Sequence, residues 1–224
     1  MNTRTQSFLL LLFGGVLIHL ATGDALLNYV RPVARPWVLI AGAAIVIVSV
    51  VQLVLSSKLT ETDVGSRNGW LILMPVLVLL LIAPPALGAF TARRDPVTVA
   101  APPHPDTPFP ALTGPSPHQL KLGDFVLRVL WDSARTVTGQ NVAIDGFVVE
   151  QRPDGFILAR LVITCCAADA RPLEVLIRSS VHPQPDSWVD VTGSYSGLDP
   201  ATSELPTLAA GHVTAIPTPA NPYD

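Results

Sequence analysis

Residues 37–57 read WVLIAGAAIVIVSVVQLVLSS, a run that contains no Asp, Glu, Lys or Arg. As a helix rising about 1.5 Å per residue, a run of this length reaches about 30 Å, the thickness of the hydrocarbon layer of a bilayer. Two similar charge-free stretches flank it, Gln6–Gly23 and Asn68–Ala92. The sequence therefore predicts a membrane α-helical region over residues 1–95, with three spans at about 7–29, 37–57 and 69–90.

Two polar side chains stand out inside these expected spans, His19 and Gln52. Ionisable and amide groups in lipid usually face a partner or a cavity. We expect them to hydrogen-bond across helices, with Gln52 as a candidate partner for His19. One histidine and one amide are too few for a transport path, so the sequence predicts anchoring, or docking beside a larger membrane protein, rather than a channel.

The rest of the chain has the character of a soluble protein. Residues 96–119 are rich in proline and predict an extended linker, and residues 120–224 follow as one soluble domain. A short helix over Phe125–Ala134, capped by Asp124, precedes stretches of period two. These stretches are Asn141–Glu150, Gly155–Cys166, Leu173–Ser180, Trp188–Tyr195 and Leu208–Ile216. The fold class predicted for this half is an all-β domain resembling an OB-type barrel.

Charge and motif content argue against two classes of function. From Pro96 onward the chain carries seven Lys and Arg against thirteen Asp and Glu. Such an acidic domain repels phosphate backbones, and it lacks the basic groove and aromatic platform that bind single strands, so we expect no nucleic-acid partner. It also lacks a Gly-x-Ser-x-Gly elbow, and Asp145, Asp169 and Asp190 are spread over separate predicted strands. The sequence therefore does not predict an enzyme.

The chain's two cysteines are adjacent, in the stretch LVITCCAAD at residues 161–169. Neighbouring residues of a strand point to opposite faces. Cys165 shares its parity with Ile163 and is expected to be buried, which leaves Cys166 as the accessible and more reactive thiol.

Three interpretations of this pair remain open. A disulfide between neighbours is geometrically poor, because adjacent Cα atoms lie about 3.8 Å apart and bridges prefer about 4.4–6.8 Å. A soft-metal or metalloid site would use Cys165, Cys166 and Asp169, with His182 or His212 completing it. The third interpretation is two small apolar side chains that end a core strand. No cofactor is required by the sequence, and a soft metal ion is the one candidate.

Several segments together resemble a known family. They are LLNYVRP (26–32), GQNVAIDGFV (139–148), LARLVITCCAADA (158–170), WVDVTG (188–193) and PANPYD (219–224). The chain resembles the YcgQ-like bacterial family of permease-subunit membrane proteins. The resemblance implies an auxiliary subunit in the cell membrane, with the lipid bilayer and a larger permease subunit as partners.

The residue patterns and the family resemblance lead to the same functional expectation. We expect an integral, multi-pass membrane protein whose tethered β domain binds or presents solute or a partner for a permease. The short amino-terminal tail and the acidic, proline-rich remainder favour a soluble domain outside the cytoplasm. The alternative is a membrane-anchored metal-binding or redox-sensing protein that uses the Cys165–Cys166 pair.

Overall fold

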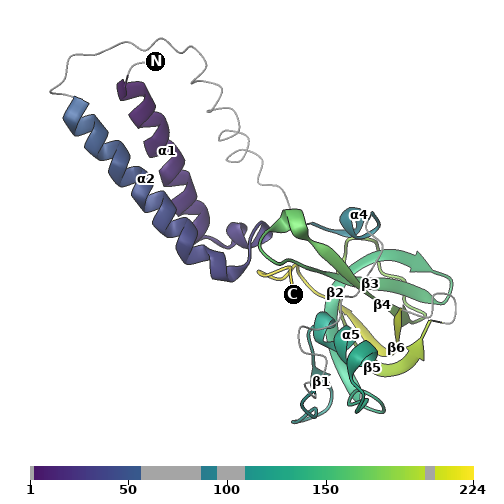
Figure 1. Cartoon of the computed structure of the whole chain (residues 1–224). Coiled ribbons are helices and arrows are strands. Elements are labelled where there is room, and N and C mark those ends of the chain that lie inside the picture. The colour runs from purple at the N-terminus through teal and green to yellow at the C-terminus, as the bar shows by residue number, and fades with distance from the viewer. Residues whose placement is uncertain (1–2, 57–86, 95–108, 200–204) are drawn as a thin grey trace. The chain divides into compact units, whose positions relative to one another are not determined.

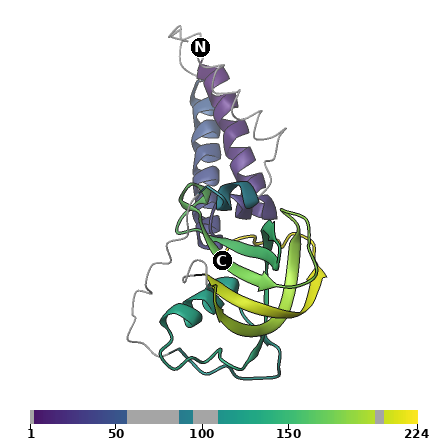
Figure 2. The ribbon, with the colours of Figure 1, turned by 90° about the vertical axis from the view of Figure 1, so that its right-hand side faces the viewer.

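The computed structural model describes residues 3–56, 87–94, 109–199 and 205–224 (Figures 1 and 2). The chain divides into two compact units, Met1–Ala86 and Leu87–Asp224, and each is considered by itself. The first unit contains α1 (Thr3–Thr22), the 3-10 turns η1 (Asp24–Asn28) and η2 (Pro32–Ala34), and α2 (Arg35–Ser56). The second contains α4 (Ala89–Ala92), β1 (His118–Gln119), α5 (Leu122–Trp131), β2 (Asn141–Arg152), β3 (Gly155–Val162), η4 (Ala167–Asp169), β4 (Arg171–Arg178), β5 (Trp188–Leu198) and β6 (Pro206–Ala215).

In the first unit, α1 and α2 lie side by side as an antiparallel pair (Figures 1 and 2). Two glycines permit the close approach, since a Cβ on Gly42 would lie 2.9 Å from Ile18 Cγ1 and 3.2 Å from the Gly14 carbonyl oxygen. Arg35, the first residue of α2, binds the carboxyl-terminal end of α1. Its Nε donates to the Ala21 carbonyl at 2.7 Å. This side chain therefore satisfies one of the last carbonyls of α1, which the helix itself leaves without a partner.

The prediction of three membrane spans is wrong. Among the described residues one helix is long and apolar enough to cross a membrane, Pro32–Leu55, and 11 % of it is buried. The apolar part of α1 is shorter, Gln6–Thr22, because the helix stops at Thr22 where the chain turns towards α2. Most of the third expected span, 69–90, lies outside the described residues, and its described end belongs to the second unit.

The second unit is a closed five-stranded barrel, as predicted for the soluble half. Its strand order is β2-β3-β4-β6-β5, and β5 pairs back onto β2. The β4–β6 pair is parallel, and the other pairs of the barrel are antiparallel. β2 pairs with both β3 and β5 and so closes the barrel. Gly146 permits the close approach of β3, because a Cβ there would lie 2.6 Å from the Ala159 carbonyl oxygen.

The barrel interior is filled by alternate side chains of its strands. β2 contributes Val142, Ile144 and Val148, and each is fully buried. Helix α5 covers this interior with Leu122, Phe125 and Val126, which lie on one helical face because of their spacing. The helix begins at Leu122, three residues before the predicted start at Phe125. Asp124 is therefore inside its first turn, where it binds Arg128 at 3.0 Å instead of capping the helix.

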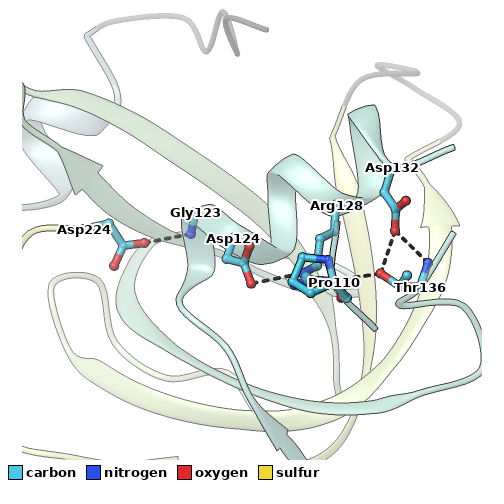
Figure 3. A network of polar contacts seen from close by, with 7 residues as sticks. All are labelled: Pro110, Gly123, Asp124, Arg128, Asp132, Thr136 and Asp224. Carbon is cyan, nitrogen blue, oxygen red and sulfur yellow. Dashed lines mark hydrogen bonds and ion pairs between the residues drawn. The ribbon is translucent and has the colours of Figure 1, made fainter. Parts of the chain in front are cut away.

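A polar network fastens the segment before α5 to the barrel (Figure 3). Arg128 is buried, and its Nη1 donates to the Pro110 carbonyl at 2.8 Å and to Thr136 Oγ1 at 2.9 Å. Asp132 accepts hydrogen bonds from the backbone and the hydroxyl of Thr136 (Figure 3). The end of the expected linker is thereby held on the barrel.

A second apolar cluster lies on the outer face of β3 and β4. Ile157, Ala159, Leu161 and Leu176 form its base, and α4 covers them with its buried residues Ala89 and Ala92. The Ala89 amide donates to Asp186 Oδ1 at 2.7 Å. The barrel unit thus starts at Leu87, whereas the predicted boundary lies at residue 95, and the expected linker 96–119 is preceded and followed by segments of one unit.

Candidate functional site

The most chemically distinctive part of the barrel is the connection between β3 and β4. Strand β3 ends at Val162, and η4 follows at Ala167–Asp169. Asp169 folds back on this connection: its Oδ1 accepts the Thr164 amide at 2.9 Å and its Oδ2 accepts the Cys165 amide at 2.8 Å. One carboxylate therefore fixes the backbone that carries both cysteines.

The two thiols lie together at this turn. Both are free cysteines, with Cys165 exposed and Cys166 half-buried, and their Sγ atoms are 3.6 Å apart. The predicted burial of Cys165 and exposure of Cys166 is wrong. The prediction extended the alternation of β3 to Cys166, but the strand ends four residues earlier and Asp169 turns the chain out of the sheet.

Asp169 also shifts the pKa of the neighbouring Cys165 thiol. Its hydrogen bond to the Cys165 thiol, with a second one between the two thiols, raises the pKa of Cys165 to about 11. The same thiol contact, together with the backbone amides, lowers the pKa of Asp169. At neutral pH Cys165 is consequently a neutral thiol beside a carboxylate, which is not the electropositive setting of an activated nucleophile.

The predicted completion of a metal site by histidine is not seen in the described part of the chain. Among those residues no group of three or more His, Cys, Asp and Glu side chains is placed to hold a metal ion. His182 lies in the connection between β4 and β5, and His212 lies in β6. What the fold does bring together is the pair of thiols of Cys165 and Cys166, while the Asp169 carboxylate beside them accepts backbone amides.

The structure contains a buried polar cluster around Arg160 that was not predicted from the sequence. Arg160 of β3 is buried, and its Nη1 lies 2.7 Å from Asp145 Oδ2. Its Nη2 donates to the Asn221 carbonyl at 2.8 Å, and its Nε lies 3.2 Å from Asp224 Oδ1. Its guanidinium also lies 5.3 Å from the centre of the Trp188 ring. The sequence contains one signal for this cluster, a single arginine inside the apolar stretch FILARLV. A charge buried in such a stretch needs polar partners nearby.

The last residues of the chain join α5 and β3 beside Arg160. Asp224 Oδ2 accepts the amide of Gly123 in the first turn of α5 at 2.7 Å (Figure 3). The Asp224 amide donates to the Leu161 carbonyl at 3.0 Å, and Tyr223 pairs with Leu161 in a parallel bridge. Four of the five segments that carry the family resemblance therefore contribute side chains or backbone groups around one arginine.

Two of the carboxylates expected to be apart are direct neighbours. Asp145 of β2 lies opposite Asp190 of β5 in the antiparallel ladder. Burial, and then the nearby Asp145, raise the pKa of Asp190, while His212 acts in the opposite direction. Asp145 itself binds Arg160, so one member of the pair is tied to a cation and the other is partly desolvated.

The polar side chains of the helical unit do not bind each other as expected. His19 lies near the end of α1 and Gln52 near the end of α2, which are opposite ends of an antiparallel pair. Gln52 Oε1 instead accepts a hydrogen bond from Ser7 Oγ at 3.3 Å. The expected contact between helices therefore exists, but with another residue.

OB-type barrels, the class that the sequence predicts, take ligands on one wall, and the corresponding wall is occupied here. Those folds bind oligonucleotides and oligosaccharides on the face of their second and third strands. In this chain these strands are β3 and β4, and Ala89, Ala92 and Tyr223 pack on that face. Cys165, which follows the end of β3, is exposed to solvent.

Comparison with known proteins gives one partial match, to a family model that covers less than half of the chain. No curated protein and no solved structure matches the chain. Residues 125–223, which run from within α5 to Tyr223, match the family model described as the DUF1980 C-terminal domain.

Proposed function

We propose that this protein is a membrane-anchored auxiliary subunit of a permease, with α2 as its anchor and the barrel as the module that meets the partner. The observation that carries the proposal is the surface of α2. The helix Pro32–Leu55 is charge-poor and 11 % buried, and Ile40, Ile47 and Val54 are each about 60 % exposed. An apolar surface of this extent is suited to lipid or to another apolar helix.

Two further observations support an auxiliary role for the barrel. The face that binds ligands in OB-type barrels is covered here by the chain's own α4, which favours a role other than binding nucleic acid or oligosaccharide on that face. The resemblance to permease subunits supplies the class of partner. We place the barrel outside the cytoplasm, on the basis of its acidic charge and its proline-rich approach; a reporter fused after Asp224 tests that placement.

The test of the auxiliary role is purification from membranes in a mild detergent, combined with deletion of the gene. We expect the chain to elute with one larger multi-span protein in a fixed ratio, and deletion to change transport by that protein. A chain that elutes alone, in cells whose transport is unaltered by the deletion, contradicts the proposal.

A second candidate function is favoured by one observation, the two free thiols 3.6 Å apart, of which Cys165 is exposed. It is a membrane-anchored sensor of soft metals or of redox state. Thiol titration and metal analysis of the full chain test it against the double variant Cys165→Ser/Cys166→Ser. The sensor requires that the wild type bind or react and that the double variant do neither.

A further inference from the structure

The backbone between β3 and β4 places two sulfur atoms on one side of the chain. In a continuing strand the side chains of Cys165 and Cys166 would point to opposite faces. The strand ends at Val162, and the Asp169 carboxylate binds the amides of Thr164 and Cys165. As a result the two Sγ atoms lie 3.6 Å apart, and Cys165 is exposed to solvent.

We propose that Cys165 and Cys166 form a bidentate dithiol site for a trivalent thiophilic centre that needs only two protein sulfurs, such as arsenous acid or a monosubstituted arsenoxide. This inference deepens the second candidate function by naming a class of ligand. It does not depend on docking to a permease.

The number of protein ligands at the site favours a trivalent thiophilic centre over a metal ion such as zinc. Structural zinc takes four protein ligands, and catalytic zinc takes three. The described residues offer no group of three His, Cys, Asp or Glu side chains for a metal ion. Both oxygens of Asp169 already accept backbone amides, so the carboxylate serves to hold the turn. Two soft sulfur donors remain, and soft donors select soft acceptors.

The geometry also separates this site from a disulfide. Neighbouring Cα atoms are about 3.8 Å apart, while disulfides prefer about 4.4–6.8 Å. A trivalent centre between the sulfurs closes a larger ring than a direct S–S bond. The present separation of 3.6 Å between the sulfurs leaves the backbone hydrogen bonds of Asp169 in place.

The binding step needs no oxidant. With a monosubstituted arsenoxide, two S–H bonds and the arsenic–oxygen double bond break, and two arsenic–sulfur bonds form. The two thiol protons and the oxygen leave as one water molecule. Arsenic stays trivalent, and no electron is transferred to or from the protein.

The experiment uses the purified full chain in detergent with phenylarsine oxide as the probe. We expect one adduct per chain in the intact mass spectrum, the loss of both titratable thiols, and reversal by a dithiol but not by an equal concentration of a monothiol. In the single variants Cys165→Ser and Cys166→Ser, affinity should fall at least ~100-fold, because the second bond is no longer intramolecular.

Two controls keep the outcome decisive. Far-ultraviolet circular dichroism verifies that each single variant retains the barrel, and Ser194→Cys in the double Cys→Ser background provides a surface thiol without a neighbour. Three results overturn the proposal: no adduct with the folded wild type, equal affinity in either single variant, or equal affinity for the lone thiol. Retention of a stoichiometric divalent metal by the wild type after dialysis also overturns the two-ligand assignment.

Discussion

At the scale of single residues, Arg160 joins β3 to Asp145, Asn221 and Asp224 in one buried cluster. Its side chain is 8 % exposed and Asp224 is 5 % exposed, so the pair is shielded from water. Asp145 lies on its other side at 2.7 Å. Removing one partner of a buried ion pair leaves the other charge without compensation, and this loss exceeds the net gain that the pair itself provides.

We therefore predict that Arg160→Met lowers the free energy of unfolding by about 3–5 kcal/mol. Chemical denaturation of the full chain, followed by tryptophan fluorescence, measures the change. Arg178→Met is the matched control, because Arg178 and Asp154 form an exposed pair at 3.8 Å. Such pairs contribute about 0–1 kcal/mol. Equal effects of the two substitutions would contradict the assignment of Arg160 as a buried anchor.

The raised pKa of Glu174 predicts that the stability of the folded protein depends on pH. Burial, and then the charge of Glu150, raise its pKa from 4.5 to about 7. The folded state therefore binds a proton more readily than the unfolded state, and stability decreases as the pH rises through this interval. Glu174→Gln should raise the melting temperature relative to wild type at pH 8. The difference should shrink as the pH falls towards the ordinary pKa, and a difference constant with pH counts against a raised pKa for this half-buried carboxyl.

The sequence shows some of these residues and hides others for physical reasons. It identified the Cys165–Cys166 pair as the unusual feature because adjacency is visible in one dimension. It placed the wrong cysteine at the surface, because the Cys165 amide donates to the Asp169 carboxylate and turns the chain out of the sheet, which the apolar pattern does not reveal. The pairing of Asp145 with Asp190 depends on strand register, which the pattern of single strands leaves open.

At the scale of elements, the barrel was predictable because each strand carries its own period of two and its own turn residues. Helix α4 was not predictable as part of the barrel, because Leu87–Ala92 continues a charge-free run that has the composition of a membrane span. Composition measures only how apolar a segment is. It does not distinguish contact with lipid from contact with an apolar barrel face, and here Ala89 and Ala92 make the second kind of contact.

Packing of α4 gives a prediction at this scale. Ala89 is fully buried against the second apolar cluster, while Phe90 next to it is 64 % exposed. Ala89→Leu should lower the free energy of unfolding by about 1–3 kcal/mol, because the added methyl groups overfill the site. Phe90→Leu should change it by less than about 0.5 kcal/mol. Denaturation curves of the two variants provide the comparison, and an Ala89→Leu variant as stable as wild type contradicts the docking of α4.

At the scale of the whole molecule, the chain combines an apolar helix with an acidic barrel. The length of α2 was readable from composition, whereas the number of spans was not, because α1 ends at Thr22 and the end of the third run belongs to the barrel. The anchor is therefore assigned to α2. Its exposed residues give opposite expectations in water and in lipid, and that difference makes the assignment testable.

The most direct measurement is alkaline carbonate extraction of membranes that contain the full chain, compared with the variant Ile40→Asp/Ile47→Asp. Both isoleucines are exposed on α2, so in water the substitutions are harmless, whereas in lipid each aspartate opposes insertion by about 2.5–3.5 kcal/mol. The control variant Val181→Asp/Leu198→Asp places the same charges on exposed barrel positions. We predict that wild type and control remain in the membrane pellet and that the α2 variant is released. Release of the wild-type chain, or retention of all three proteins alike, would contradict anchoring by α2.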